Sequence, residues 1–369
     1  MTTPLHGPTF SSYAPDEVSW LLQDLSDAEL EAPTAERERR IQSGTAHYAE
    51  SLPVEYQPDE QYRALFDAVL ADTAPRLATA VGVVTELIRA ERGPHPVLAS
   101  LARAGTPIGI LIRRWAGHVH AETWPHYTVS IVRDRGIDSA ALDYLTRHHD
   151  PSSVVFVDGW TGKGAIAREL TEALDAHAAA GGARFDDRLA VLADPGHCVT
   201  TYGTRDDFLI ASACLNSTVS GLVSRTVLND ALIAPGEFHG AKFYAELAEV
   251  DVSNRLLDTV SDRFDAVRDA VEDGVRQVQA GDRTPTWSGW HSVEQVRERY
   301  GIASVNFVKP GVGETTRVLL RRVPWRVLVR DAEAPEHRHI RLLADARGVP
   351  VDVVPDLAYS CVGLIKELE

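Results

Sequence analysis

Residues 154–170 read VVFVDGWTGKGAIAREL and carry the strongest local pattern in the chain. Four β-prone apolar residues end at Asp158, a glycine-rich turn follows, and apolar residues at helical spacing begin near Gly164. This order is typical of a buried parallel strand that leads into a helix. The segment therefore predicts an α/β protein.

The turn at residues 161–164 is a candidate anion site. Backbone N–H groups at a helix start have no helical partner, and the positive end of the helix dipole adds to them. Asp158, at the carboxyl end of the strand, is placed to accept hydrogen bonds from sugar hydroxyls or to hold a metal. An ordinary strand-to-helix turn is the simpler interpretation. A Walker A loop is excluded, because Val157 stands five positions before Gly162 and neither Ser nor Thr follows Lys163.

The strand-loop-helix order recurs along the chain. Strands are predicted near residues 97, 127, 154 and 189, with helices between them, which indicates a mostly parallel, doubly wound sheet. In such sheets ligands bind beyond the carboxyl ends of the strands. The loops that follow these strands are therefore the candidate binding loops.

Two of these loops carry arginines. The first contains Ser100, Arg103 and Gly105, and a guanidinium can bind a phosphate through two parallel hydrogen bonds. The second contains Arg133 and Arg135. Two interpretations of the second loop stay open: a mobile basic loop that closes over a ligand, and a helix start capped by Asp138 with solvated arginines.

Composition and charge exclude some classes of protein. The formal net charge of −16 argues against broad adhesion to DNA or anionic membranes, so any nucleic-acid contact has to be local. The three cysteines, Cys198, Cys214 and Cys361, show no Cys-x-x-Cys spacing, which favours a reducing compartment. No window approaches the roughly 18 apolar residues of a membrane span. We expect a cytoplasmic protein.

The 369 residues are predicted to form four parts. They are an N-terminal helical region (1–95), an α/β domain (96–280), a linker (281–302) and a small α/β/α module (303–369). Helices are expected from Pro15 onward, at 60–92 and at 256–278, and in the module at 313–322, 335–347 and 356–368, with module strands at 326–329 and 351–354.

The turn and its strand resemble the binding motif of type I phosphoribosyltransferases. This resemblance implies that the turn holds the 5-phosphate of phosphoribosyl pyrophosphate, that Asp158 holds the ribose with magnesium, and that the Ser100 loop holds the pyrophosphate. Gly159 stands where that family has a second acid. The residues it assigns to substrate are Ser100, Gly105, Gly159, Thr161, Gly162, Lys163 and Gly164, together with Arg103, Arg133 and Arg135 as catalytic cations. Ser217, Thr218 and Ser220, in a segment dense in hydroxyl residues, are added as a substrate lining.

Longer phrases resemble a more particular family. The phrases IQSG (41–44), SLARAGTP (100–107) and DGWTGKG (158–164), with the run 216–229, are similar to phosphoribosyltransferase-like proteins of tellurite-resistance and stress-response operons, the StiP family. Some members carry the label of cysteine protease.

The tail resembles a different family. KPGVGETTR (309–317), followed by WRVLV (325–329), is similar to the Pelota-type RNA-binding domain, although Gly313 replaces the Asn of that family. The resemblance implies RNA binding by Lys309, Glu314, Thr315, Thr316, Arg317 and Arg321.

These resemblances imply a phosphoribosyltransferase that uses phosphoribosyl pyrophosphate and magnesium with an unidentified nitrogenous acceptor. Two alternatives stay open. One is a non-catalytic regulator that binds a nucleotide or RNA. The other is a cysteine protease with Cys214 as nucleophile and His197 or His239 as base. A homodimer also stays open.

Overall fold

The computed structural model describes residues 3–32, 47–55, 60–334 and 337–365. The phrase at 41–44 lies outside these residues. A six-stranded sheet, all parallel, forms the centre of the described chain. In spatial order its strands are β1 (Ser19–Leu21), β6 (His126–Val129), β5 (Val97–Leu101), β9 (Val154–Trp160), β10 (Ala190–Ala193) and β11 (Thr201–Thr204). The four predicted strands and their parallel arrangement are confirmed.

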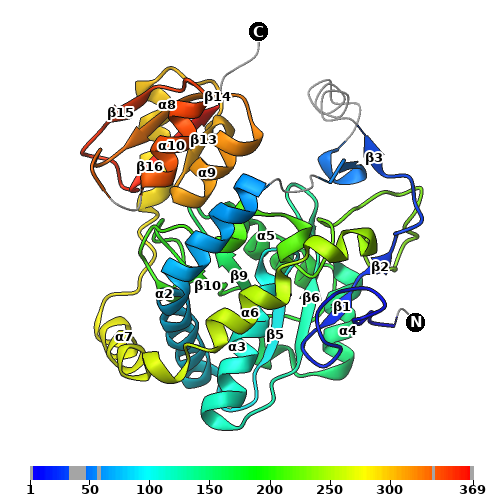
Figure 1. Ribbon diagram of the computed structural model, residues 1–369. Coiled ribbons are helices and arrows are strands. Elements are labelled where there is room, and N and C mark those ends of the chain that lie inside the picture. Colours follow the sequence, from blue (N-terminus) through cyan, green and yellow to red (C-terminus); the bar gives the residue numbers. More distant parts are fainter. Residues whose placement is uncertain (1–2, 33–46, 56–59, 335–336, 366–369) are drawn as a thin grey trace.

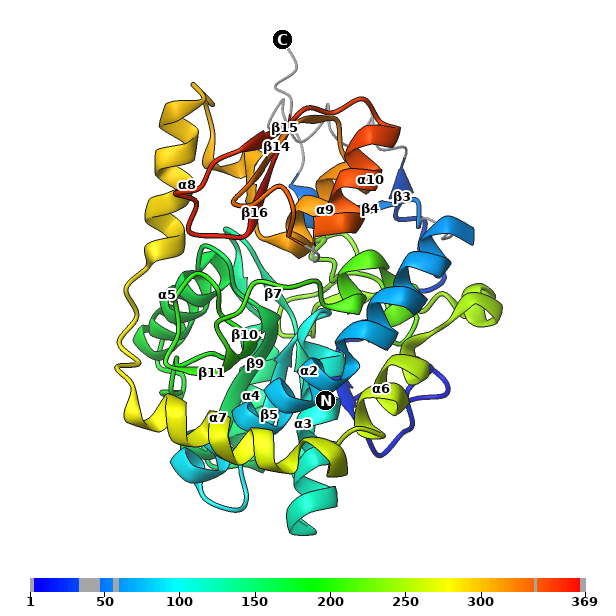
Figure 2. The same cartoon turned by 60° about the vertical axis from the view of Figure 1, so that its left-hand side comes forward.

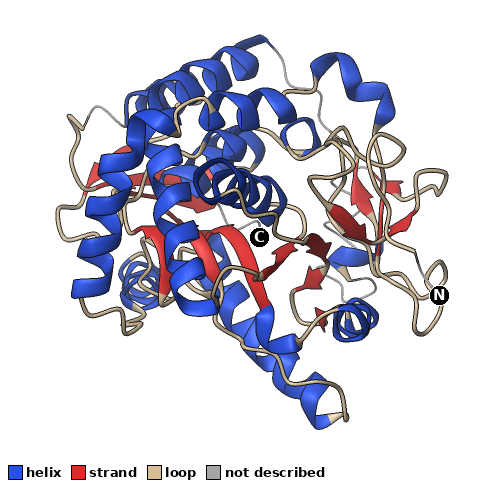
Figure 3. Ribbon diagram, turned by 90° about the horizontal axis from the view of Figure 1, so that it is seen from below, coloured by secondary structure: helices blue, strands red, loops and turns tan. Residues whose placement is uncertain are grey.

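Helices cover both faces of this sheet (Figure 3). Side chains alternate along β9: Val155 and Val157 join the core formed by α2 (Glu60–Arg92) and α3 (Gly105–His120). Val154 and Phe156 join the core formed by α4 (Ser139–His148) and α5 (Ala165–Ala179). A strand buried on both faces needs apolar residues at every position, which explains the unbroken run of apolar residues in its sequence.

Short strand pairs complete the core. They are β2 (Gln23–Asp24) with β12 (Gly240–Ala241), β3 (Glu31–Ala32) with β4 (Leu52–Pro53), and β7 (Ile131–Val132) with β8 (Gly136–Ile137).

Two predicted helices of the core are wrong. The segment after Pro15 forms the edge strand β1, because Trp20 and Leu21 are buried on opposite faces of the sheet, as the two-residue period of a strand requires. The helix predicted at 256–278 is two helices, α6 (Ser253–Ser261) and α7 (Arg268–Ala280). Val260, Phe264 and Val267 are all buried at the bend between them, so the chain turns there to keep its apolar face on α2 and α3.

The C-terminal module is built on a four-stranded sheet in the order β13 (Val308–Pro310), β16 (Cys361–Ile365), β14 (Pro324–Val329), β15 (Val351–Val353). Its helices are α8 (Ser288–Arg299), α9 (Val312–Arg321) and α10 (Arg338–Ala346). The helix predicted at 356–368 is wrong, since 361–365 form the strand β16 between two neighbours. Cys361, Val362 and Leu364 are all buried, and α9 comes so close that a Cβ on Gly363 would lie 3.1 Å from Thr315 Cα.

The module sits at the carboxyl edge of the large sheet (Figures 1 and 2). Asp207 accepts hydrogen bonds from Val312 N (2.9 Å), Ser360 N (3.0 Å) and Ser360 Oγ (2.8 Å). Tyr359 donates its hydroxyl hydrogen to Gly162 O at 2.7 Å. Val312 and Leu319 of α9 belong to the same hydrophobic core as α2 and α3. Core and module therefore share buried apolar surface as well as hydrogen bonds.

Candidate functional site

The loops after β5 and β9 meet at the carboxyl edge of the sheet, as predicted. Their strands are neighbours, with Ser100 paired to Val157. A Cβ on Gly105 would lie 2.4 Å from Val157 O, and one on Gly159 would lie 3.4 Å from Ala104 O. The two loops are therefore in contact, and glycine is needed at position 105 for so close an approach.

The turn at 161–164 is enclosed by backbone from three sides. Gly164 has φ +71° and ends the turn at the start of α5. A Cβ on Gly196 would lie 1.6 Å from Gly162 O, and one on Gly289 would lie 2.4 Å from the same oxygen. Thr161 N donates to Ala193 O at 3.0 Å. The geometry of this turn is thus fixed by the loop after β10 and by α8 of the module.

Asp158 lies beside this turn in a half-buried position. Burial raises the pKa of its carboxyl to about 7, while the hydrogen bond from Gly159 N (2.7 Å) acts in the opposite direction. The described residues contain no group of three His, Cys, Asp or Glu side chains able to hold a metal ion. The assignment of magnesium to Asp158 stays a prediction.

The cations and hydroxyls assigned to the β5 loop are engaged within the protein. Ser100 is buried, and its hydroxyl lies 2.7 Å from His126 Nε2. Arg103 donates to Val223 O (3.2 Å) and Asn216 Oδ1 (3.1 Å), and burial lowers the pKa of its guanidinium. In this closed arrangement Arg103 holds the segment 216–223 against the sheet.

That segment includes the predicted hydroxyl lining, which is buried. Ser217 donates its N–H and its hydroxyl hydrogen to Glu55 Oε1, at 2.9 and 2.7 Å. Ser220 donates its hydroxyl hydrogen to Asn216 O at 3.0 Å, and Thr218 is 1% exposed. Ser217 therefore ties this loop to the segment at Glu55, and Ser220 stabilises the loop itself.

The basic loop is the tight connection between β7 and β8. Its backbone is held by Glu169 of α5, which accepts hydrogen bonds from Asp134 N and Gly136 N, both at 3.0 Å. Asp138 caps α4, as the second interpretation of this segment requires. Arg135 is exposed, whereas Arg133 is half-buried and acts electrostatically on Lys163 and Lys309.

The residues assigned to RNA differ in their surroundings. Lys309 and Glu314 act electrostatically on Lys163 of the turn, and Glu314 accepts a hydrogen bond at 3.1 Å from Arg317, whose side chain is 43% exposed. Thr315 and Thr316 are fully buried. The side chain of Arg321 lies outside the described residues. A Cβ on Gly313 would lie 3.4 Å from Ala213 Cβ of the core, so this position packs tightly in the docked module.

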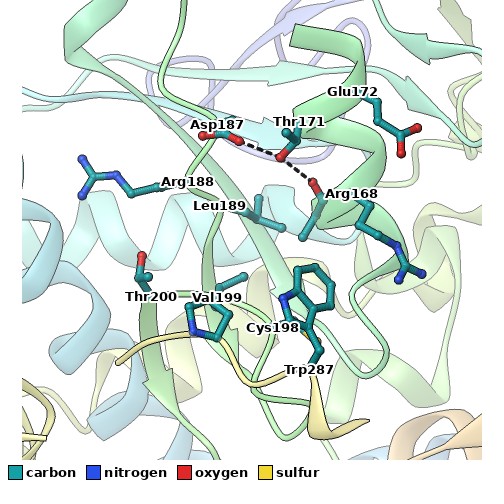
Figure 4. Close-up of a pocket in the computed structure, with 12 residues that line it drawn as sticks. Arg168, Thr171, Glu172, Asp187, Arg188, Leu189, Cys198, Val199, Thr200 and Trp287 are labelled. Atoms are coloured by element: carbon teal, nitrogen blue, oxygen red, sulfur yellow. Dashed lines mark hydrogen bonds between the residues drawn. The ribbon is translucent and has the colours of Figure 1, made fainter. Parts of the chain in front are cut away.

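A cavity of about 310 Å³ lies beside the other end of the turn, between α5, the segment before β10 and the linker (Figure 4). No local sequence motif marks this cavity, because its lining comes from segments that are far apart in the chain. Leu189, Cys198 and Trp287 line its apolar part, and Arg168 and Asp187 lie at its polar part. Trp287 closes over Gly164, where a Cβ would lie 2.2 Å from its ring.

Cys198 is therefore the cysteine that lines this cavity. Its Sγ lies 3.3 Å from Gly196 O and 3.7 Å from Gly162 O. Burial raises the pKa of the thiol to about 12, and the carboxylate of Asp194 adds to this effect. Asp194 itself accepts hydrogen bonds from Cys198 N and Val199 N, and burial raises its pKa to about 7.

The other cysteines and the histidines considered for a cysteine-protease site have different surroundings. Cys214 and Cys361 are 0% exposed and belong to the main core. His239 lies next to Ser130 Oγ (2.8 Å), and burial lowers the pKa of its imidazole. His197 is half-buried, and its carbonyl oxygen accepts a hydrogen bond from Trp287 N at 3.0 Å. Burial lowers the pKa of this imidazole as well.

Comparison with known proteins identifies the family. Residues 11–261 match the family described as tellurite-like stress resistance cysteine protease StiP, and residues 287–367 match the PELOTA RNA binding domain. The chain is 34% identical over 373 residues to a protein named cysteine protease StiP from Acinetobacter baylyi, covering 97% of this chain and 94% of that protein. The chain belongs to the StiP family and carries a Pelota RNA-binding domain. No solved structure matches.

These matches confirm the family resemblance and correct the expected activity. The prediction of a phosphoribosyltransferase is wrong, because both the family and the relative are named as cysteine proteases. The motif at 158–164 misled the prediction, since a strand, a glycine turn and a helix are the geometry of an anion site in many α/β proteins and do not define a reaction. The phosphoribosyltransferase-like fold beyond the parallel α/β sheet also stays a prediction. No described helix is both long and apolar enough to cross a membrane.

The raised pKa of Cys198 predicts how its reactivity changes with pH. Alkylating agents react with the thiolate, whose fraction rises about tenfold per pH unit below the pKa. In a chain with Cys214 and Cys361 changed to Ala, the iodoacetamide rate should rise about 100-fold from pH 7 to pH 9 and continue to rise at pH 10. A rate that levels off near pH 9, as it does for a thiol of ordinary pKa, would contradict the described environment.

Proposed function

We propose that this chain is a cysteine peptidase and that Cys198 is its nucleophile. The proposal takes its activity from the name of the family and of the relative. The observation that carries the assignment to Cys198 is its place in the wall of the 310 Å³ cavity, where a side chain of a peptide substrate can be held beside the sulfur. Cys214 and Cys361, each 0% exposed within the main core, are less suited to meet a substrate.

The proposed peptidase is latent in the described arrangement. A cysteine peptidase attacks the peptide carbonyl with a thiolate, and a pKa near 12 keeps Cys198 in the thiol form at neutral pH. We infer that His197 is the base, since it precedes Cys198 and is bonded through its backbone to the linker at Trp287. Movement of that linker would free His197 and uncover Cys198 together. The thiol proton then passes to the imidazole, and the sulfur forms a bond to the carbonyl carbon. The peptide C–N bond breaks as the imidazolium returns the proton to the leaving amine, and water hydrolyses the thioester to free the acid and the thiol.

A panel of cysteine substitutions tests the assignment. The panel is made in a full chain that also carries Asp207→Ala, a change that weakens docking of the module. In that chain Cys198→Ala should lower the rate of casein hydrolysis at least about 1,000-fold, because the nucleophile is lost. Cys214→Ala and Cys361→Ala are the matched controls and should keep activity within a few-fold, with thermal melting as a check that each variant is folded. Loss of activity in Cys214→Ala, with full activity in Cys198→Ala, would sink the assignment.

We propose RNA binding by the C-terminal module as a second function. The match of residues 287–367 to the Pelota RNA-binding domain supports it, as does the electrostatic contact between Lys309 on β13 and Arg317 on α9. Lys309 is half-buried and acts on Lys163 of the core while the module is docked. RNA binding is therefore expected to compete with docking.

Weakening the docking contact should increase RNA binding. Asp207→Ala removes the acceptor of three hydrogen bonds from the module and should shift the chain toward the undocked form. The affinity for a short RNA, measured by fluorescence anisotropy at low salt, should rise severalfold. Asp206→Ala is the control, because the carboxylate of this neighbouring residue is exposed and pairs with Arg76 at 2.7 Å. If the Asp207→Ala chain, the Asp206→Ala chain and the native chain bind the RNA with equal affinity, RNA binding does not compete with docking of the module.

A further inference from the structure

A second cavity, of about 540 Å³, lies between the N-terminal segment, α3 and α6. Glu17 comes just before β1, and Arg114 lies roughly 14 Å along α3 from Gly105, which is at the carboxyl edge of the sheet. The cavity is therefore near the amino edge of the parallel sheet, away from the module and from Cys198. Its polar lining residues are Ser12, Glu17, Arg114, Asn254 and Asp258.

Arg114 holds the two carboxylates of this cavity in place. Its Nε donates a hydrogen bond to Glu17 Oε1 at 2.5 Å, and its Nη1 donates one to Asp258 Oδ1 at 2.8 Å. The backbone of Glu17 is fixed as well, because its carbonyl oxygen lies 2.9 Å from His126 Nδ1 on β6. The acidic side of the cavity is thus built on the sheet and on two helices.

Two polar atoms of the lining are left without a partner. Among the residues that the structure describes, neither Glu17 Oε2 nor Ser12 Oγ has a hydrogen-bond partner, and both atoms are shielded from solvent. Glu17 is only 7% exposed, and Ser12 is held by Asn254, whose Nδ2 donates to Ser12 O at 2.8 Å. An unpaired buried polar atom costs free energy, and a carboxylate oxygen can only accept. A ligand that donates hydrogen bonds would satisfy both atoms.

The charges of the lining favour a cation. Glu17 and Asp258 carry two negative charges and Arg114 carries one positive charge, which leaves one negative charge in excess. A metal ion is the less suitable cation, because the described residues contain no group of three His, Cys, Asp or Glu side chains that could hold one. An ammonium group carries a positive charge and three hydrogen-bond donors, so it fits both the charge and the unpaired acceptors.

We propose that this cavity binds a small aliphatic amine in its ammonium form. One N–H of the ammonium donates to Glu17 Oε2 and a second donates to Ser12 Oγ, while Asp258 adds to the attraction. The alkyl part of the ligand packs on the apolar lining at Pro8 and Tyr13. This site is separate from Cys198 and does not depend on the proposed peptidase activity.

Titration of the full chain with n-butylamine in a calorimeter, at about 150 mM salt to screen attraction to the acidic surface, tests the proposal. Glu17→Gln keeps the size of the side chain and removes its charge, so it should weaken binding at least about tenfold. Ser12→Ala should weaken binding severalfold without lowering the melting temperature, because the lost hydroxyl has no partner in the described protein. This variant keeps the test valid if Glu17→Gln fails to fold.

Two controls separate this site from general charge attraction and from the peptidase. Asp16→Asn should leave the affinity unchanged, because this neighbouring carboxylate is 77% exposed and lies 4.0 Å from Arg113. Cys198→Ala should bind n-butylamine as the native chain does.

Several outcomes would overturn the proposal. They are no binding by the native chain, unchanged affinity in Ser12→Ala, an equal loss in Asp16→Asn, and equal binding of 1-butanol, which has the same alkyl chain without the charge. Magnesium that displaces n-butylamine and loses affinity in the same variants would assign the cavity to a metal ion instead. A lysine peptide that binds far more tightly than n-butylamine would replace the free amine with a lysine side chain of a polypeptide.

Discussion

The carbonyl oxygen of Gly162 is the point on which both parts of the protein converge. It accepts the hydroxyl hydrogen of Tyr359, and the backbone at Gly196 and Gly289 approaches it too closely for any side chain. A single turn after the central strand β9 therefore positions the loop after β10, the start of α8 and the end of the module. Few substitutions are tolerated at such a contact, because backbone atoms cannot move aside as side chains do.

This convergence links the proposed peptidase site to the docking of the module. The oxygen of Gly162 lies 3.7 Å from the sulfur of Cys198, and the next residue, Lys163, donates a hydrogen bond to Val305 O of the module. Release of the module would loosen the contacts that bury Cys198. RNA bound by the released module would favour the undocked form, because a ligand shifts an equilibrium toward the state that it binds.

The sheet could be predicted from the sequence because β5, β9 and β10 contain short apolar runs, and because helices follow β5, β6 and β9 along the chain. The strand β16 could not, since its neighbours in the sheet, β13 and β14, lie more than 30 residues away from CVGLI at 361–365 in the chain. The spacing of apolar residues within a short segment does not show which distant strands that segment will pair with. The edge strand β1 was mistaken for a helix for the same reason.

The positions of the loops that form the site could be predicted from the sequence, but the contacts of their side chains could not. The positions of the glycine turn and of the β5 loop follow from their place after parallel neighbouring strands. Whether Arg103 faces a ligand or holds the loop at Asn216 depends on a contact across 113 residues. The cavity at Cys198 depends on Trp287, which reaches it from the linker. The motif at 158–164 predicts phosphoribosyl transfer, but its geometry suits several reactions. The match to the StiP family corrects that prediction.

The central claim is that the C-terminal module is docked on the sheet edge through Asp207. Hydrogen exchange at the amides of Val312 and Ser360, both of which donate to that carboxylate, tests it most directly. In the full chain these two amides should exchange slowly, with protection close to that of the amides in β9, because they open only when the module leaves the core. Exchange of both amides at the rate of an unprotected backbone, with β9 fully protected, would contradict the account.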